Sequence, residues 1–142
     1  GSELDPAPVI RAAARRGIRL YVPVVMDLAR RRMRFVPLSP FVRPGIEVTP
    51  GRHARHVTAR WFHLILCPVV GIDERGYRLG MGAGFFDRAL AFRRLRHHWR
   101  GPKLIALAFD CQRIDSVHPE SWDARLDGVI TESGLHHFLQ GA

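Results

Sequence analysis

The apolar run from Phe62 to Val70 constrains the fold of this chain more than any other feature. The whole uncharged stretch, Trp61 to Ile72, is shorter than the roughly 20 residues that a transmembrane helix needs. An apolar run of this length is typical of a strand that is buried on both faces of a parallel sheet. Residues 103–109 form a second run of the same kind. Because parallel strands need a long connection between them, we expect a helix in the crossover.

Helical spacing and turn residues place the remaining elements. Asp5 and Pro6 have the residue types of a helix cap and a first helical position, and Gly17 is a natural stop. A second helix is predicted over 85–99, where an apolar stripe changes to a basic face. Further strands are predicted over 18–25, 33–38 and 127–131, long loops over 39–60 and 110–126, and a terminal helix over 132–139. Strands that alternate with helices predict an α/β fold, a mainly parallel sheet flanked by helices.

Length and cysteine usage narrow the class of protein. The chain has 142 residues, 46% of them hydrophobic, which predicts one domain, residues 1–142, with a real core. Residues 1–3 are polar and do not resemble the start of a signal peptide. The two cysteines, Cys67 and Cys111, form no Cys-x-x-Cys pair, which argues against a disulfide scaffold or a cysteine zinc site. We therefore expect a cytoplasmic protein that is not bound to a membrane.

The positive charge lies mainly in the first half of the chain. Residues 1–60 hold 12 arginines against 4 acidic residues, whereas the rest of the chain is close to neutral. A basic half suggests an anionic partner, either nucleic acid or a phosphorylated or carboxylated small molecule. A second interpretation stands beside this one. With 21 arginines and one lysine, the excess is also what a coding bias towards arginine produces, with most of these side chains simply solvated.

The densest chemical signal is the segment Arg78 to Arg88, in which glycine recurs at every second position from Gly80 to Gly84. Glycine lets a backbone approach a ligand closely, so that several N–H groups converge on an anion. A carboxylate beside a phosphate needs a cation between them, which makes Asp87 a candidate Mg²⁺ ligand. The alternative is a glycine-rich turn that packs a helix against a sheet, with Asp87 stabilising the helix N-terminus. Spacing alone leaves both interpretations open, because neither the Gly-x-Gly-x-x-Gly nor the Walker A pattern is present.

This segment resembles the hallmark of the 5-formyltetrahydrofolate cyclo-ligase family, also called 5,10-methenyltetrahydrofolate synthetase. The family's string is Arg-Leu-Gly-x-Gly-x-Gly-Tyr/Phe-Tyr-Asp, and Arg78 to Asp87 matches it with Phe85-Phe86 as the aromatic pair. Other stretches resemble the family in the same order, and the resemblance runs from about Glu3 to Ser133. These stretches are Glu3-Leu-Asp-Pro, Leu20-Tyr-Val-Pro-Val, Pro68-Val-Val-Gly-Ile-Asp, Ala108-Phe-Asp-Cys-Gln, Glu120-Ser-Trp-Asp and Asp127-Gly-Val-Ile-Thr-Glu.

The resemblance implies a fold and a reaction. The fold would be Rossmann-like, of the NagB/RpiA/CoA-transferase-like type. The reaction would be the ATP- and Mg²⁺-dependent cyclisation of 5-formyltetrahydrofolate to 5,10-methenyltetrahydrofolate, with release of ADP and phosphate. The formyl oxygen would attack the γ-phosphate, and the N10 nitrogen would then displace phosphate. Positioning and charge neutralisation do most of the work in such a phosphoryl transfer, and no catalytic nucleophile is implied.

The resemblance also assigns roles to residues. The ATP-binding residues would be Arg78, Leu79, Gly80, Met81, Gly82, Ala83, Gly84, Phe85 and Phe86. The folate, with one or several glutamates, would contact Glu3, Met81, Gly82, Ala83, Gly84 and Phe85. Asp87 and Asp123 match the family's Mg²⁺ ligands. We expect a monomer with ATP and a reduced folate as its small-molecule partners.

Departures from the family keep other functions open. The family has a further helix and strand before Glu3, with basic residues that bind ATP phosphates, and this N-terminal element is absent from the sequence. The activity of the 142-residue chain is therefore in question. One alternative is a degenerate homologue that binds folate or nucleotide without turnover. Another is a basic nucleic-acid-binding protein, although no RNA-binding signature supports it.

Histidine and cysteine supply no competing site. Neighbouring histidines such as His97-His98 and His136-His137 do not share one face of a helix, so they do not predict a metal site. His63, inside the apolar run, is expected to be a hydrogen-bonded core residue. Cys67 is expected to be buried and inert in its strand.

Overall fold

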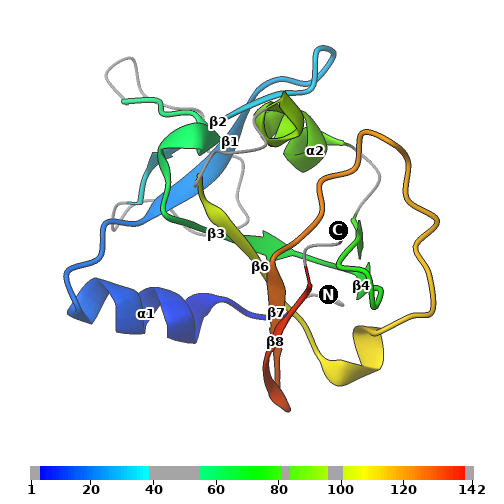
Figure 1. Ribbon diagram of the computed structural model, residues 1–142. Coiled ribbons are helices and arrows are strands. Elements are labelled where there is room, and N and C mark those ends of the chain that lie inside the picture. Colours follow the sequence, from blue (N-terminus) through cyan, green and yellow to red (C-terminus); the bar gives the residue numbers. More distant parts are fainter. Residues whose placement is uncertain (1–3, 39–54, 81–83, 96–100, 140–142) are drawn as a thin grey trace.

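A four-stranded mixed sheet forms the centre of the computed structural model, which describes residues 4–38, 55–80, 84–95 and 101–139 (Figure 1). Its strands are β3 (Leu64–Pro68), β6 (Lys103–Leu107), β7 (Gly128–Thr131) and β8 (Gly134–His137), in the order β3-β6-β7-β8. β6 runs parallel to both β3 and β7, whereas β8 is antiparallel to β7. The two apolar runs are thus confirmed as strands of the sheet, and the structure shows them to be parallel neighbours.

The hydrophobic core lies against these strands and is closed by residues from the loops. Leu104 and Ala106 of β6 are fully buried, and Leu90 and Leu126 pack into the same cluster. Burial alternates along β6, and Leu64 at the start of β3 is 53% exposed. The expectation of strands buried on both faces is therefore wrong in part, because side chains on one face of β6 and at the start of β3 are more exposed than those on the other. His63 is also exposed, which corrects its expected place in the core.

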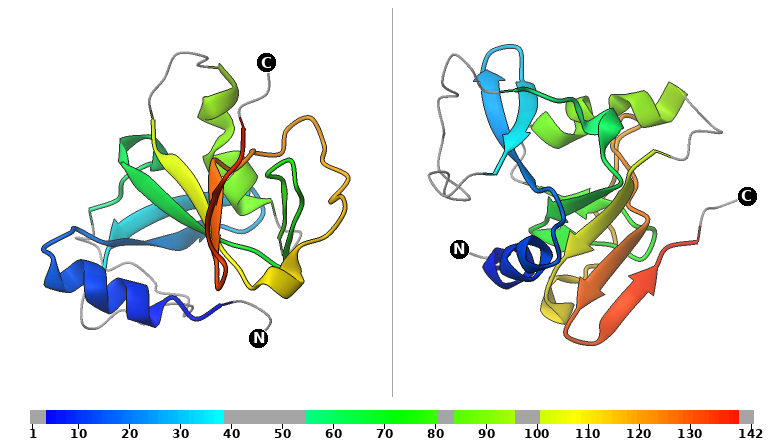
Figure 2. Two further views of the ribbon diagram at one scale, coloured as in Figure 1. Left: turned by 60° about the horizontal axis from the view of Figure 1, so that its bottom comes forward. Right: turned by 90° about the vertical axis from the view of Figure 1, so that its left-hand side faces the viewer.

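The N-terminal part consists of one helix and one hairpin. α1 (Ala7–Arg15) begins one residue later than predicted, because Pro6 is the N-cap and not the first helical residue, and Asp5 Oδ1 accepts a hydrogen bond of 3.0 Å from the Ala7 N–H. β1 (Tyr21–Asp27) and β2 (Arg32–Pro37) pair antiparallel, with an irregular register near the tip. Figures 1 and 2 show the tip of this hairpin close to the short helix α2 (Phe85–Ala89), away from α1.

A small antiparallel ladder, β4 (Gly71–Ile72) with β5 (Arg78–Leu79), comes between β3 and α2 in the chain. Its turn is organised by Asp73, whose side chain is buried. Asp73 Oδ1 accepts hydrogen bonds of 3.0 Å from the N–H groups of Arg75 and Tyr77, and Oδ2 accepts one of 3.2 Å from Val117. The carboxylate therefore holds the predicted turn and also ties it to the loop that follows β6.

The predicted helix over 85–99 is only partly confirmed. α2 ends after Ala89, and residues Ala91–Leu95 continue as a 3-10 helix. Leu90 at the junction is 1% exposed, and the Arg93 N–H bonds to its carbonyl at 3.1 Å. Arg93 is thereby turned towards the sheet, where its guanidinium pairs with Asp127 at 3.2 Å. Residues 96–99 lie outside the described part of the chain.

The predicted terminal helix over 132–139 is wrong, because β8 occupies this segment. Thr131 pairs with Gly134 across a two-residue turn, and Gly134 has a φ of +113°, which favours glycine. Thr131 Oγ1 accepts a hydrogen bond of 3.1 Å from the Ser133 N–H. The backbone of β7 needs partners on its free side, and a returning strand supplies them whereas a helix satisfies only itself.

The structure therefore confirms an α/β fold with a mixed sheet and helices. Three of the connections between sheet strands differ from a regular strand–helix alternation: the β6–β7 crossover contains only a 3-10 helix, Asp110–Gln112, β7–β8 is a hairpin, and β4–β5 interrupts the first crossover. The Rossmann-like subclass stays a prediction. No helix in the described residues is long and apolar enough to cross a membrane.

The packing of β6 leads to a stability prediction. Leu104→Ala removes a fully buried side chain from the centre of the core, and we expect a loss of about 2–5 kcal/mol in the free energy of unfolding. Leu135→Ala on β8, where the side chain is 53% exposed, is the matched control and should cost less than about 1 kcal/mol. Urea unfolding monitored by circular dichroism measures both variants. Equal losses would contradict the assignment of Leu104 to the core.

Candidate functional site

The glycine-rich segment joins β5 to α2, as predicted for a strand–loop–helix site. Gly84 stands immediately before α2 with a φ of +74°, a left-handed conformation that other L-residues adopt at a cost. Gly80 stands at the other end of the loop, immediately after β5. Met81, Gly82 and Ala83, three of the predicted ligand-binding residues, lie outside the described residues, as does Glu3.

Arg78 is the best-packed charged side chain of this segment. Its side chain is 8% exposed, its Nη2 lies 3.3 Å from Asp87 Oδ1, and its guanidinium lies 5.3 Å from the centre of the Phe86 ring. A Cβ atom on Gly80 would lie 2.6 Å from Arg78 Nη1. A side chain at position 80 would therefore displace the guanidinium from its present place, a contact that the alternating glycines do not show by themselves.

Asp87 connects the glycine segment to a distant loop. Its Oδ1 also accepts a hydrogen bond of 3.1 Å from the N–H of Ala124. Asp123, the other predicted Mg²⁺ ligand, is therefore adjacent in sequence to a residue that Asp87 holds. Asp123 Oδ2 accepts a hydrogen bond of 2.8 Å from the Glu120 N–H, which fixes the turn that presents it. Trp122, which lies between Glu120 and Asp123 in the sequence, is 53% exposed and is not a core residue.

The predicted site residues that the structure describes differ in what they contact. Arg78, Phe86 and Asp87 are in direct contact, and the loop of Asp123 joins them through Ala124. Leu79 is 46% exposed and contributes its backbone to the β4–β5 ladder. Phe85 is half-buried against the hydrophobic core. The described residues contain no group of three or more His, Cys, Asp or Glu side chains placed to hold a metal ion.

Arg31 was not predicted as part of the site, yet it reaches the glycine segment. A Cβ on Gly84 would lie 3.4 Å from Arg31 Nη1. Arg31 lies at the tip of the β1–β2 hairpin, 53 positions earlier in the chain. The only sequence signal was the run Arg30-Arg31-Arg32 within a basic half, and nothing in that run shows which distant element it meets.

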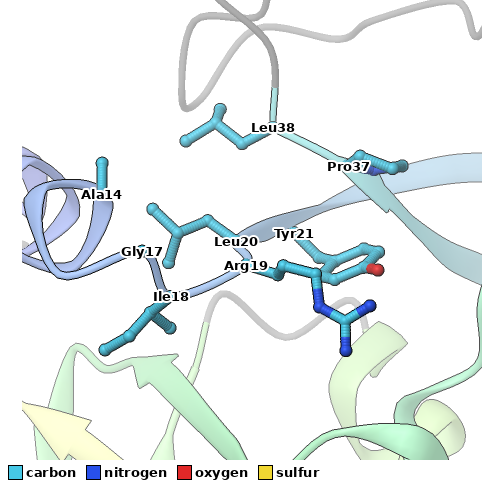
Figure 3. A pocket seen from close by; sticks show the side chains of 8 residues that line it. All are labelled: Ala14, Gly17, Ile18, Arg19, Leu20, Tyr21, Pro37 and Leu38. Atoms are coloured by element: carbon cyan, nitrogen blue, oxygen red, sulfur yellow. The ribbon is translucent and has the colours of Figure 1, made fainter.

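A separate recess of about 620 Å³ lies between the end of α1 and the β1–β2 hairpin (Figure 3). Its lining includes the apolar side chains of Ile18, Leu20 and Leu38 and the ring of Tyr21 (Figure 3). None of the predicted site residues that the structure describes lines this recess. The ring of Tyr21 packs on Phe62 at 5.1 Å between ring centres, so its position is set by the core.

Comparison with known proteins tests the family resemblance of the chain. A sequence model of the 5-formyltetrahydrofolate cyclo-ligase family matches residues 1–132. The chain belongs to this family. The 5-formyltetrahydrofolate cyclo-ligase of Escherichia coli K12 is 34% identical over 136 residues, which cover 92% of this chain and 72% of that protein. The Haemophilus influenzae protein of the same name is 25% identical over 135 residues, with 90% and 69% coverage.

Solved structures of cyclo-ligase relatives share the fold. A 5,10-methenyltetrahydrofolate synthetase of Aquifex aeolicus matches with a TM-score of 0.72 at 22% identity, over 99% of this chain and 68% of that one. The synthetase of Mycoplasma pneumoniae matches with a TM-score of 0.59 at 24% identity, over 85% of this chain and 60% of that one. The chain thus spans between three-fifths and three-quarters of the length of these family members.

The charged pair of this cyclo-ligase family member lies near a buried thiol. Cys67 of β3 is 1% exposed, and burial raises the pKa of its thiol to about 12. The positive charges of Arg78 and Arg93 lower the pKa, and the carboxylates of Asp87 and Asp127 raise it, but burial is the largest cause. Cys67 therefore stays a neutral thiol at physiological pH and is not suited to act as a nucleophile.

Thiol labelling tests this difference in burial. At pH 8 we expect one equivalent of an alkylating reagent to react with the native protein, at the exposed Cys111, and two equivalents to react after unfolding. The reason is that a thiol with a pKa of about 12 holds almost no thiolate at pH 8. Intact-mass spectrometry counts the adducts. The Cys111→Ser variant should show no adduct in the native state, and rapid labelling of that variant would contradict the burial of Cys67.

Proposed function

We propose that the protein is a 5-formyltetrahydrofolate cyclo-ligase, which cyclises 5-formyltetrahydrofolate to 5,10-methenyltetrahydrofolate with ATP and Mg²⁺ and releases ADP and phosphate. Within it, the described part of the chain supplies the segment that binds the nucleotide phosphates. The observation that carries the proposal is the contact of Arg78 with Asp87 across the glycine segment, joined by Asp87 to the loop of Asp123. Membership of the cyclo-ligase family supports 5-formyltetrahydrofolate as the substrate.

Arg78 has the chemistry of a phosphate-binding residue. Its Nε atom is buried and makes no hydrogen bond within the described residues. A buried donor without a partner costs about 1–3 kcal/mol, which an acceptor from a ligand would recover. Guanidinium groups bind phosphate oxygens in a planar, two-point geometry that this donor and a neighbouring Nη atom can offer. Phe86 holds the group in place from one side through a cation–π contact.

Asp87 and Asp123 fit an Mg²⁺ ion that is bound partly by the nucleotide. Each carboxylate has one oxygen without a hydrogen bond or ion pair among the described residues, Oδ2 of Asp87 and Oδ1 of Asp123. Mg²⁺ is commonly held by one or two carboxylates, with phosphate oxygens and water completing the coordination. When bound, the ion would neutralise phosphate charge beside the two aspartates.

The reaction needs positioned substrates more than a reactive side chain. The formyl oxygen attacks the γ-phosphorus and ADP leaves, which produces an iminium phosphate. The N10 nitrogen then attacks the formyl carbon, and the proton on N10 passes to solvent. Phosphate departs with the formyl oxygen. The residues of this chain bind and orient: Arg78 holds phosphate, and the glycine segment brings the backbone close to it. Met81 to Phe85 and Glu3 remain proposed folate contacts.

The activity test uses the full-length protein. We expect the methenyl product, followed by its absorbance, to form only when ATP, Mg²⁺ and 5-formyltetrahydrofolate are all present, with one ADP released per product. Omission of each component in turn is the control. Binding of ATP and folate without any product would contradict the ligase proposal and support a binding homologue. Absence of ATP binding would contradict the site itself.

The metal assignment has its own test. Asp87→Asn keeps an acceptor for the Ala124 N–H but removes the negative charge that would bind Mg²⁺. We expect the Mg²⁺ concentration at half-maximal rate to rise at least tenfold, because carboxylate charge dominates the binding of hard cations. Asp115→Asn, an exposed loop position, is the matched control. A titration curve that does not move in Asp87→Asn would contradict its role as a ligand.

A further inference from the structure

An exposed tryptophan, Trp122, precedes Asp123 in the loop before β7, and neither the core nor the site described so far accounts for it. It is 53% exposed. Within the described ranges, its ring packs on no other aromatic ring and lies under no guanidinium group. Single exposed apolar residues are common on protein surfaces. What singles out Trp122 is the place of its loop beside the glycine segment.

The loop that carries Trp122 is tied to both ends of the glycine segment. On the side of the β4–β5 turn, Asp73 Oδ2 accepts a hydrogen bond of 3.2 Å from the Val117 N–H. On the side of α2, Asp87 Oδ1 accepts one of 3.1 Å from the Ala124 N–H. Figure 1 shows the loop passing β4 and reaching α2 before it enters β7. Trp122 therefore lies two positions from the point where this loop meets the candidate site.

Two hydrogen bonds fix the turn in which Trp122 lies. The Asp123 N–H donates to the Glu120 carbonyl at 3.1 Å, and the Glu120 N–H donates to Asp123 Oδ2 at 2.8 Å. Ser121 and Trp122 are the two central residues of this turn. A backbone that is already ordered loses little conformational entropy when a ligand binds to it. The turn thus presents a large aromatic ring to solvent on a fixed backbone, one position before a candidate Mg²⁺ ligand.

The chemistry of this loop favours a planar ring without negative charge. Residues 114–124 contain three acidic side chains, Asp115, Glu120 and Asp123, and no lysine or arginine. Negative charges of a ligand would be repelled here unless a cation lies between them. An indole ring stacks on any nucleobase, because every base presents a π-face. A nucleotide whose phosphates are held through Mg²⁺ at Asp123 carries such a base next to those phosphates.

We propose that the indole ring of Trp122 stacks on the base of the nucleotide whose phosphates bind at Arg78 and, through Mg²⁺, at Asp87 and Asp123. This inference rests on the proposed function for the identity of the nucleotide. It adds a group that recognises the base, whereas Arg78 and the glycine segment recognise phosphate. The stacking contact is the same before and during phosphoryl transfer. Its loss should therefore raise the KM for ATP and leave kcat unchanged.

Calorimetry with the full-length protein compares MgADP with magnesium pyrophosphate, which has the two phosphates but no base. We expect MgADP to bind at least about tenfold more tightly, as stacking on an aromatic ring provides. Trp122→Leu keeps an apolar side chain without a flat ring and should lower this ratio about fivefold or more, whereas Trp122→Phe should keep most of it. Trp61→Leu, at a tryptophan that is 70% exposed, is the matched control. An unchanged ratio in Trp122→Leu, or an equal loss in both leucine variants, would overturn the proposal.

Fluorescence tests whether the ring itself meets the base. In a variant that keeps Trp122 as its only tryptophan, we expect MgADP to quench the emission and magnesium pyrophosphate to leave it unchanged. Weaker binding of 5-formyltetrahydrofolate by Trp122→Leu, with MgADP binding unchanged, would overturn the choice of the base in favour of the folate ring.

The stacking proposal and the proposed function fail separately. Production of methenyltetrahydrofolate by a protein that binds MgADP and magnesium pyrophosphate equally would contradict the stacking role and leave the ligase activity in place. Tighter binding of MgADP that is lost in Trp122→Leu, in a protein that forms no product, would support the stacking role and contradict the ligase activity. Binding of neither ligand would overturn both.

Discussion

Asp127 joins three separate parts of this molecule through its side chain and its backbone. Its Oδ2 accepts a hydrogen bond of 2.8 Å from the buried N–H of Leu104, and both oxygens bind the guanidinium of Arg93 at 3.2–3.3 Å. Its backbone N–H donates to the Leu104 carbonyl at 2.8 Å, and its carbonyl accepts from the Phe138 N–H at 2.9 Å. Asp127 thereby connects the central strand β6, the 3-10 helix after α2, and the C-terminal hairpin. A carboxylate can be buried in this position because both of its oxygens accept hydrogen bonds and an arginine balances its charge.

The site depends on a similar arrangement of opposite charges. Arg78 and Asp87 hold the two ends of the glycine segment together, and Asp87 carries the contact on to the loop of Asp123. Arg93 and Asp127 hold the 3-10 helix that follows α2 on the sheet. This ion pair therefore also helps to fix the position of α2, which carries Asp87. Both pairs also act on the pKa of Cys67, which the arginines lower and the aspartates raise, and burial is the largest cause of its rise. The phosphate-binding proposal thus rests on a framework that is fixed by the core.

The basic character of the chain has a local meaning that its total charge of +9 does not convey. Arginines on α1 are exposed and spread over one helix, whereas those at the hairpin tip line one groove next to α2. Coding bias explains the number of arginines as well as an anionic partner does. It does not explain why five of them line a single groove beside Gly84.

The sequence by itself determined the local features of this protein. The apolar runs around Ile65 and Leu104 became strands, Asp5 bound the first N–H of α1, and the string from Arg78 to Asp87 indicated the family and a candidate site. These features depend on residues that are close in sequence, where propensity and spacing act directly.

Only the tertiary structure decided the rest. The segment after Thr131 became a strand because β7 needed a backbone partner, and the helix after Phe85 changed course at Leu90 because Arg93 is drawn to Asp127, 34 positions away. Arg31 also lies beside Gly84 only in the tertiary structure, since the two residues are 53 positions apart. Each outcome depends on groups far apart in the chain, whose meeting is set by burial and pairing that no local pattern contains.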